Sequence, residues 1–232
     1  DIVYFRDTAA CGTATAVSLP CLFSSLPRKK FDASDAKYTE NLMDFLRKAG
    51  YDVLWVENDD GCKGVCDRVK TRDAVSEGHP RFCFKSYCWD DALLAGLEND
   101  LKTVEKDTVI VLHTMGSHGP AYYQRYPDGF KRFQPICDTA DIQKCPRESI
   151  VNTYDNTIPY TDYIVSSAID ILKKFPQFES GLVYVSDHGE SLGENNIYLH
   201  GFPYAIAPDE QKRVPMLLWL NRLSRERVAD YA

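Results

Sequence analysis

The chain has 232 residues, a formal net charge of −7 and 44% apolar residues. A chain of this length can bury a core of its own, and the composition is that of a globular protein rather than a disordered or fibrous one. The acidic balance argues against a nucleic-acid-binding protein, whose affinity depends on neutralising phosphates. No stretch approaches the roughly 18 apolar residues that a membrane helix needs. We therefore expect a single soluble domain that does not bind nucleic acid.

Strand and helix patterns alternate along the chain. A turn and a short helix that Pro20 limits are expected within residues 11–21, and residues 116–146 are expected to form a long functional loop. Strands separated by helices indicate an α/β fold with a mostly parallel sheet covered on both sides. Apolar runs predict strands at 1–5, 51–56, 108–112, 182–185 and 214–220, and helical spacing predicts helices at 38–48, 88–101 and 147–175.

Eight cysteines form four local couples. Sequence alone does not fix their connectivity, but each couple closes a short loop in a turn-like stretch. None has the spacer that a zinc ribbon repeats, so we favour disulfides over thiolate metal sites and infer an oxidising compartment. The expected bridges join neighbours: Cys11–Cys21, Cys62–Cys66, Cys83–Cys88 and Cys137–Cys145.

Histidines follow two of the expected strands. His113 and His118 come after the run 108–112, Asp187 and His188 come after the run 182–185, and His200 lies in a glycine-flanked loop. In open α/β sheets, ligands bind beyond the carboxyl ends of the strands. A carboxylate beside an imidazole suits zinc, although a single Asp-His pair can also be an ordinary turn. Convergence of these segments at one sheet edge favours the metal site.

Thr13 is the candidate nucleophile. The segment Cys11-Gly-Thr-Ala-Thr places it at a predicted helix N-terminus, where free N–H groups stabilise an anion. A threonine hydroxyl needs a base or a metal to activate it, and zinc would do so. The simpler alternative is that Thr13 or Thr15 only caps the helix.

Four motifs occur together in the chain: Cys11-Gly-Thr-Ala-Thr, His113-Thr-Met-Gly-Ser-His118, Ser186-Asp-His-Gly-Glu190 and Tyr198-Leu-His-Gly201. In this order they make the chain resemble the soluble catalytic domain of the bacterial phosphoethanolamine transferases that modify lipid A. This group includes the mobile colistin-resistance enzymes, and the resemblance runs over nearly the whole chain. It implies a three-layer α/β/α sandwich of the alkaline-phosphatase/sulfatase type.

The resemblance also implies a zinc-dependent nucleophile. Thr13 matches the threonine that becomes phosphoethanolaminated, and Asp187 and His188 match ligands of one tightly bound zinc ion. The family's zinc is also held by a glutamate in a Gly-Glu-Thr segment upstream of the nucleophile, and this chain contains no such segment. We expect that ligand, the first core strand and an N-terminal membrane domain to belong to the parent protein outside this chain.

Other residues match the substrate side of the family's site. His118 and His200 match residues that hold the phosphoethanolamine or a second zinc ion, and Lys63 matches a substrate-site lysine. His113 is expected near the same site without an assigned role. Glu190 either orients a zinc ligand or lies on the surface.

The implied reaction is a two-step transfer at the periplasmic face of the bacterial inner membrane. Phosphatidylethanolamine is the donor and lipid A is the acceptor, and the added amine masks anionic charge and so gives resistance to polymyxins and other cationic peptides. We expect a monomer tethered to the membrane by the N-terminal domain.

Two alternatives stay open. One is a related phosphotransferase or hydrolase of the same superfamily that acts on another acceptor, such as a lipopolysaccharide core sugar. A sulfatase is disfavoured because Cys21 does not begin a Cys-x-Pro-x-Arg pattern. Lipoteichoic-acid synthases are disfavoured because their substrate is glycerol phosphate. The other is a disulfide-stapled binding module without activity, which needs no ordered convergence of these motifs.

Overall fold

The computed structural model describes residues 2–229, so Asp1 of the first expected strand lies outside the described residues. The predicted strands and helices occur in the expected chain order, and the structure adds short elements that the apolar patterns do not predict. The strands are β1 (Ile2–Phe5), β2 (Asp52–Glu57), β3 (Lys70–Asp73), β4 (Thr108–His113), β5 (Gly181–Val185), β6 (Ser191–Leu192), β7 (Tyr198–Leu199) and β8 (Met216–Leu220). The helices are α1 (Thr15–Leu22), α2 (Leu42–Lys48), α3 (Ala74–Glu77), α4 (Asp91–Ala95), α5 (Leu97–Lys102), α6 (Arg147–Lys173) and α7 (Arg222–Ala229).

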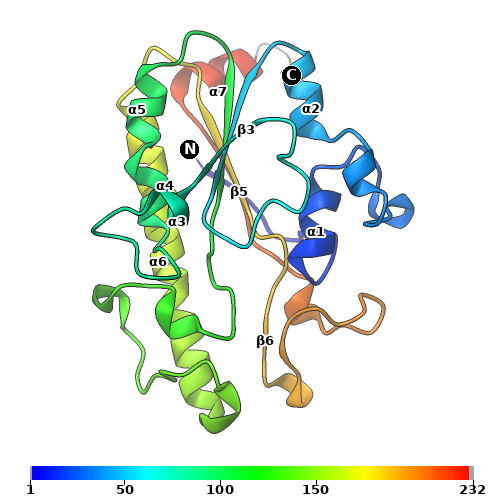
Figure 1. Ribbon diagram of the computed structural model, residues 1–232, viewed down its shortest axis with the longest axis vertical. Coiled ribbons are helices and arrows are strands. Elements are labelled where there is room, and N and C mark those ends of the chain that lie inside the picture. Colours follow the sequence, from blue (N-terminus) through cyan, green and yellow to red (C-terminus); the bar gives the residue numbers. More distant parts are fainter. Residues whose placement is uncertain (1, 230–232) are drawn as a thin grey trace.

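The main strands form a central layer between two layers of helices (Figure 1). Helices α4, α5 and α6 cover one face, where α5 and α6 pack on β4 and β5 through Leu97, Leu101, Ala168 and Leu182. Helices α1 and α2 cover the other face. The α/β class and the three-layer architecture are therefore confirmed.

The central layer consists of two three-stranded sheets with different pairing. In the first, β3, β2 and β4 are parallel, with β2 in the middle, as the alternation of strand and helix predicts. In the second, β8 lies between β1 and β5 and is antiparallel to both. No α-helix lies between β5 and β8 in the chain, so the loop that carries β6 and β7 returns β8 in the opposite direction.

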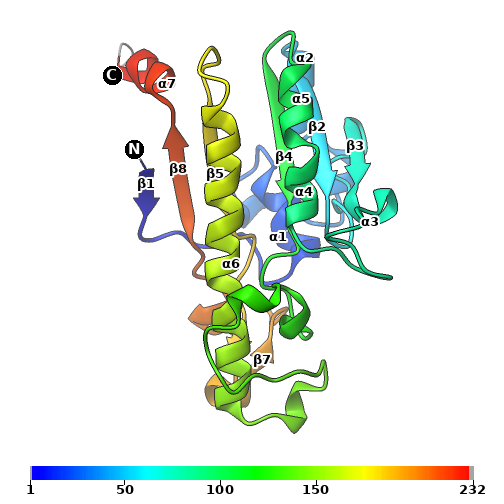
Figure 2. The ribbon, with the colours of Figure 1, turned by 90° about the vertical axis from the view of Figure 1, so that its left-hand side faces the viewer.

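A large cavity separates the two sheets. Within the described residues β4 pairs with β2 alone and β5 pairs with β8 alone, so one edge of each strand has no partner strand. Figure 2 shows the two sheets on either side of this division, with α6 in front of β5. The cavity has a volume of about 1830 Å³ and is lined by apolar residues of both strands and by the polar residues that follow them.

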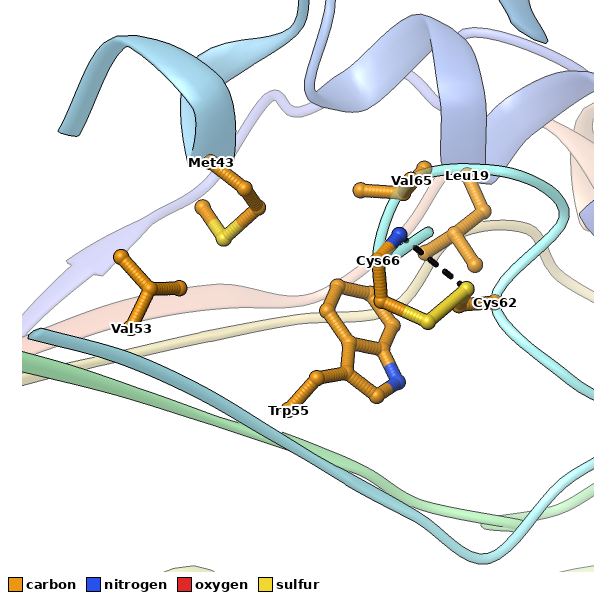
Figure 3. Packing of buried hydrophobic residues seen from close by; sticks show 7 residues of the cluster. All are labelled: Leu19, Met43, Val53, Trp55, Cys62, Val65 and Cys66. Atoms are coloured by element: carbon orange, nitrogen blue, oxygen red, sulfur yellow. Dashed lines mark hydrogen bonds between the residues drawn. A yellow bond between two sulfur atoms is a disulfide. The ribbon is translucent and has the colours of Figure 1, made fainter. Parts of the chain in front are cut away.

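Trp55 of β2 is at the centre of one core cluster and is completely buried. Leu19 of α1, Met43 of α2 and the Cys62–Cys66 disulfide surround it (Figure 3). This cluster fastens α1, α2 and the loop after β2 to the same face of the sheet.

The C-terminal end of α1 differs from the prediction, whereas that of α2 agrees with it. Helix α1 passes through Pro20 and ends at Leu22, so the expectation that Pro20 limits it is wrong. The proline ring removes one N–H donor, but the next amides still bond, with Phe23 N–H donating to the carbonyl of Leu19. Helix α2 ends before Gly50, as predicted, and Gly50 has a φ of +98°, which favours glycine.

The segment 88–101, expected as one helix, forms the two short helices α4 and α5. They meet at Gly96, where a Cβ would lie 2.7 Å from a guanidinium nitrogen of Arg72. Helix α6 is continuous through Pro159, and residues 116–146 form the expected long loop, with one-turn 3-10 helices as its regular structure. Among the described residues no helix is long and apolar enough to cross a membrane.

All four predicted disulfides are present. The bridges join Cys11 to Cys21, Cys62 to Cys66, Cys83 to Cys88 and Cys137 to Cys145. Their sequence separations run from 4 to 10 residues, so each one stiffens a local loop. The pairing of neighbours is confirmed.

Candidate functional site

Three histidines from separate segments gather beyond the carboxyl ends of β4 and β5. The ring centroids of His188 and His200 lie 4.3 Å apart, and the ring of His118 lies 5.0 Å from His200 and 6.5 Å from His188. His118 follows β4, His188 follows β5 and His200 follows β7. The structure thus brings together the segments that the sequence places at one sheet edge.

The Asp187-His188 segment is fastened to helix α1. Ser18 of α1 donates a hydrogen bond to the carbonyl of Asp187, and the Gly12 N–H donates to the Ser18 hydroxyl at 3.1 Å. On the other side, a Cβ at Gly189 would lie 2.0 Å from the carbonyl oxygen of Glu210. Glycine is therefore needed after His188, because the backbone at 210 occupies the space of a side chain.

The side chains of Asp187 and His188 fit a cation. Oδ2 of Asp187 is buried without a hydrogen-bond partner among the described residues, and it lies 3.7 Å from Nε2 of His188. The Nδ1 of His188 donates to the carbonyl of Gly189 at 3.0 Å, which leaves Nε2 with a lone pair. A buried carboxylate oxygen without a donor is costly unless a positive charge satisfies it.

The structure gives the two threonines different contacts. Thr13 is buried, its hydroxyl donates to the carbonyl of Phe202 at 2.5 Å, and its carbonyl accepts from Gly201 N–H at 2.6 Å. Thr15 Oγ1 lies 3.2 Å from Nε2 of His188. Ala14 is the N-cap residue of α1 and the cap has no side-chain hydrogen bond, so the capping alternative is wrong for both threonines.

Glu190 is only 8% exposed, so it is not a surface residue. Its carboxylate accepts from His200 Nδ1 at 2.9 Å, from the Tyr122 hydroxyl at 3.1 Å and from Gly119 N–H at 3.1 Å. The hydrogen bond and charge of Glu190 outweigh burial and raise the pKa of His200. Glu190 therefore orients His200 and fixes the residue that follows His118.

His118 has the opposite electrostatic environment. Burial lowers its pKa, and the neighbouring positive charges of His200 and Arg125 act in the same direction. Its backbone is held by Arg125, whose Nε donates to the carbonyl of His118 at 2.7 Å. A neutral imidazole is the form that binds a metal ion.

Lys63 lies on the loop after β2, and its ammonium is engaged within that loop. Nζ donates to the carbonyl of Asp60 and lies 3.2 Å from an Asp60 carboxylate oxygen. The positive φ of 51° at Lys63 shows how tightly this loop turns between Gly61 and Gly64. The structure therefore places Lys63 on a different loop from those that carry His118, His188 and His200, and pairs it with Asp60.

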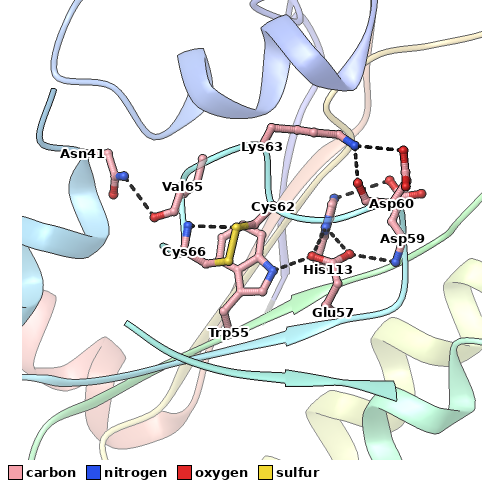
Figure 4. Close-up of a disulfide and its surroundings, with 10 residues drawn as sticks. All are labelled: Asn41, Trp55, Glu57, Asp59, Asp60, Cys62, Lys63, Val65, Cys66 and His113. Atoms are coloured by element: carbon pink, nitrogen blue, oxygen red, sulfur yellow. Dashed lines mark hydrogen bonds and ion pairs between the residues drawn. A yellow bond between two sulfur atoms is a disulfide. The ribbon is translucent and has the colours of Figure 1, made fainter. Parts of the chain in front are cut away.

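His113 has a partner that the sequence patterns did not single out. Its Nδ1 donates to both carboxylate oxygens of Glu57, at 2.8 and 2.9 Å, and its Nε2 lies 3.7 Å from Oδ2 of Asp59 (Figure 4). Burial alone would lower the pKa of His113, but the hydrogen bond and charge of Glu57 raise it, with help from Asp59 and Asp187. Burial likewise opposes ionisation of Glu57, yet His113 and Trp55 keep its pKa below its usual range.

Within residues 2–229, Cys62, Cys66 and Asp67 each place one potential metal-ligand atom within 4.8 Å of the other two. The two sulfur atoms are bonded to each other, so they offer no thiolate to a metal. The Asp187-His188 pair is the better metal candidate, and it needs further ligands.

Comparison with known proteins gives consistent results. A model of the sulfatase family matches residues 1–231. Phosphoethanolamine transferase EptA of Escherichia coli (strain K12) is 55% identical over 222 residues, which are 95% of this chain and 41% of that protein. Phosphatidylethanolamine transferase Mcr-1 of Escherichia coli is 39% identical, over 95% of this chain and 42% of that protein. The chain thus spans less than half the length of these relatives.

A solved structure agrees with both the fold and the sequence. The soluble domain of lipooligosaccharide phosphoethanolamine transferase A from Neisseria meningitidis superposes with a TM-score of 0.94 and 47% identity. The match covers 97% of this chain and 67% of that domain.

Proposed function

Because the chain belongs to the sulfatase family and, within it, to the bacterial phosphoethanolamine transferases, we propose that it is the catalytic part of an enzyme that transfers phosphoethanolamine from phosphatidylethanolamine to lipid A. The observation that carries this proposal is the gathering of the Asp187-His188 pair, His118, His200 and Thr13 at one end of the sheet. Transfer of a charged phosphoryl group depends on such positioning and on charge stabilisation.

Thr13 is the proposed nucleophile. In the first step a bond forms between Thr13 Oγ1 and phosphorus, the bond to diacylglycerol breaks, the threonine proton passes to a base, and the diacylglycerol oxygen takes up a proton. In the second step an oxygen of a lipid A phosphate bonds to phosphorus, the bond between phosphorus and Thr13 Oγ1 breaks, and Thr13 takes back the proton from the base. The covalent intermediate divides one difficult transfer into two easier steps. Burial of Thr13 supports this role, because it limits the access of water that would hydrolyse the intermediate.

Asp187 and His188, together with Thr13, are the residues that would hold a zinc ion. The buried oxygen of Asp187 and the lone pair on His188 fit a metal that accepts mixed oxygen and nitrogen ligands. When bound, zinc supplies positive charge that acidifies a threonine hydroxyl and stabilises phosphoryl oxygens. His118 and His200 are proposed to hold the phosphoethanolamine group or a second zinc ion.

The cavity between β4 and β5 suits a further strand of the parent protein. The facing edges of β4 and β5 have no partner strand among the described residues, and the cavity walls are apolar along both strands. A parallel strand placed there would end beside Asp187, where the expected glutamate of a Gly-Glu-Thr segment would complete the metal site.

The setting proposed for the whole enzyme is the periplasmic face of the bacterial inner membrane, where it acts as a monomer. Both lipid substrates are reached there, and the four disulfides suit an oxidising compartment. Adding an ammonium group to lipid A reduces its attraction for cationic peptides such as polymyxins.

The test is a mass shift on the tryptic peptide that contains Thr13, after the full-length enzyme is incubated with phosphatidylethanolamine. We expect a phosphoethanolamine adduct on Thr13 and its loss when lipid A is added. Parallel incubations with lipid A and with a lipopolysaccharide core oligosaccharide identify the acceptor. Consumption of donor with no adduct would instead indicate a hydrolase, and no consumption at all would leave a binding module.

A further inference from the structure

A buried carboxylate that the proposed transfer does not use lies beside the site. Glu57 is the last residue of β2, and it pairs in register with His113, the last residue of β4. Trp55 stands two residues earlier on the same strand, and all three side chains lie close together (Figure 4). Glu57 is 7% exposed, so its charge must be satisfied by neighbours rather than by water.

Three nitrogen donors converge on this carboxylate. The Trp55 Nε1–H donates to Oε2 at 2.8 Å, the Asp59 N–H donates to Oε1 at 2.8 Å, and the His113 Nδ1–H lies within 2.9 Å of both oxygens. An ionised carboxylate is an acceptor only, with about four lone-pair sites, so it satisfies all three donors. A glutamine in the same place would have one acceptor oxygen and would direct an NH₂ group at a donor.

These contacts determine two features on the wall of the cavity. With Nδ1 held by Glu57, the ring of His113 directs Nε2 toward Asp59, and both residues line the same cavity as Asp187 and His188. The contact with the Asp59 amide also fixes the start of the loop that carries Lys63. The end of that loop is fixed by the Cys62–Cys66 disulfide, which packs on Trp55.

We propose that Glu57 is a positioning residue of the transfer site, which sets the orientation of His113 and the first turn of the Asp59–Lys63 loop. Glu57 does not touch the reacting atoms. It acts through His113 and Asp59, which both line the cavity. The inference rests on the proposed transfer, but its structural part can be tested without activity.

The experiment compares Glu57→Gln with the wild-type enzyme and with the control Asp44→Asn. Asp44 is another buried carboxylate, on α2, and it accepts from Arg68 Nε at 2.7 Å and from Asn41 N–H at 3.0 Å. In the metal-free protein, NMR reports the hydrogen-bonded Nδ1 proton of His113 and the exchange rate of the Asp59 amide. We expect Glu57→Gln to weaken the signal of the His113 Nδ1 proton and to accelerate exchange of the Asp59 amide. Asp44→Asn should leave both measurements unchanged.

In the full-length enzyme we expect Glu57→Gln to lower kcat by about 100-fold with little change in KM, as for a small misplacement of a reacting geometry. Glu57→Asp keeps the charge on a shorter arm and should recover part of kcat, which also covers the case in which Glu57→Gln does not fold. Unchanged NMR signals in Glu57→Gln, or an equal fall of kcat in Asp44→Asn, overturn the proposal. A wild-type enzyme without transfer refutes the proposed function instead, while the NMR comparison still decides the role of Glu57.

Discussion

Glu190 provides the clearest test of how the histidine cluster is held. Its carboxylate accepts from Gly119 N–H, the Tyr122 hydroxyl and His200 Nδ1, all within 3.1 Å. Glu190→Ala leaves these three buried donors without an acceptor, at about 1–3 kcal/mol each. We therefore expect the free energy of unfolding to fall by about 3 kcal/mol or more. Glu190→Gln keeps the shape and one acceptor oxygen, so it should lose about 1–2 kcal/mol.

Urea unfolding of the metal-free protein measures these losses as a shift of the midpoint at constant slope. The matched control is Glu179→Ala, which removes a half-exposed carboxylate paired with Arg227 at 2.7 Å. Exposed ion pairs of this kind are worth about 1 kcal/mol or less. If Glu190→Ala and Glu179→Ala lower the midpoint equally, Glu190 does not hold the three donors, and the reasoning about His200 fails.

Three further predictions concern the nucleophile, acid stability and the disulfides. Thr13→Ala should abolish the phosphoethanolamine adduct while Thr13→Ser keeps some of it; an adduct that survives Thr13→Ala but not Thr15→Ala would make Thr15 the nucleophile, and peptide mass spectrometry decides between them. Hydrogen bonds from Arg68 lower the folded-state pKa of Asp44 from 3.8, so the stability it contributes is present above pH 4 or so and is lost as the pH falls through that folded value; unfolding curves at pH 6 and pH 3 should differ less in Asp44→Asn than in the wild type. Mild reduction should lower transfer activity before it lowers Tm much, because Cys11–Cys21 brackets Thr13; parallel activity and melting measurements with increasing dithiothreitol check this.

Much of the frame could be predicted because unbroken apolar runs in the sequence mark the central strands. Residues 109–112 are all apolar and lie in β4, and residues 182–185 lie in β5. Since both strands end at the same edge, the polar residues behind them, His118 and His188, had to lie close together. The disulfides were equally predictable, because cysteines four to ten residues apart can meet without any knowledge of the fold.

The missed features have little signal in the sequence. Strand β3 reads Lys70-Thr-Arg-Asp73 and is mostly exposed at the edge of its sheet, so no apolar alternation predicts it. The contact of Thr15 with His188 joins residues 173 positions apart and depends on how α1 meets the sheet. Glu57 lies just after the predicted strand 51–56, and only the register with His113 in the structure indicates its role.

In three of the histidines the ring nitrogen Nδ1 is hydrogen-bonded to an oxygen acceptor. Nδ1 of His113 is held by Glu57, Nδ1 of His188 by the carbonyl of Gly189, and Nδ1 of His200 by Glu190. Carboxylate and carbonyl oxygens only accept, so each Nδ1 carries a proton and each ring is left with Nε2 as its variable atom. A ring held in this way is fixed in both orientation and tautomer before any ligand arrives. The acceptors therefore determine that these histidines offer Nε2 to a ligand. Mutation of an acceptor should disturb the site as mutation of its histidine does.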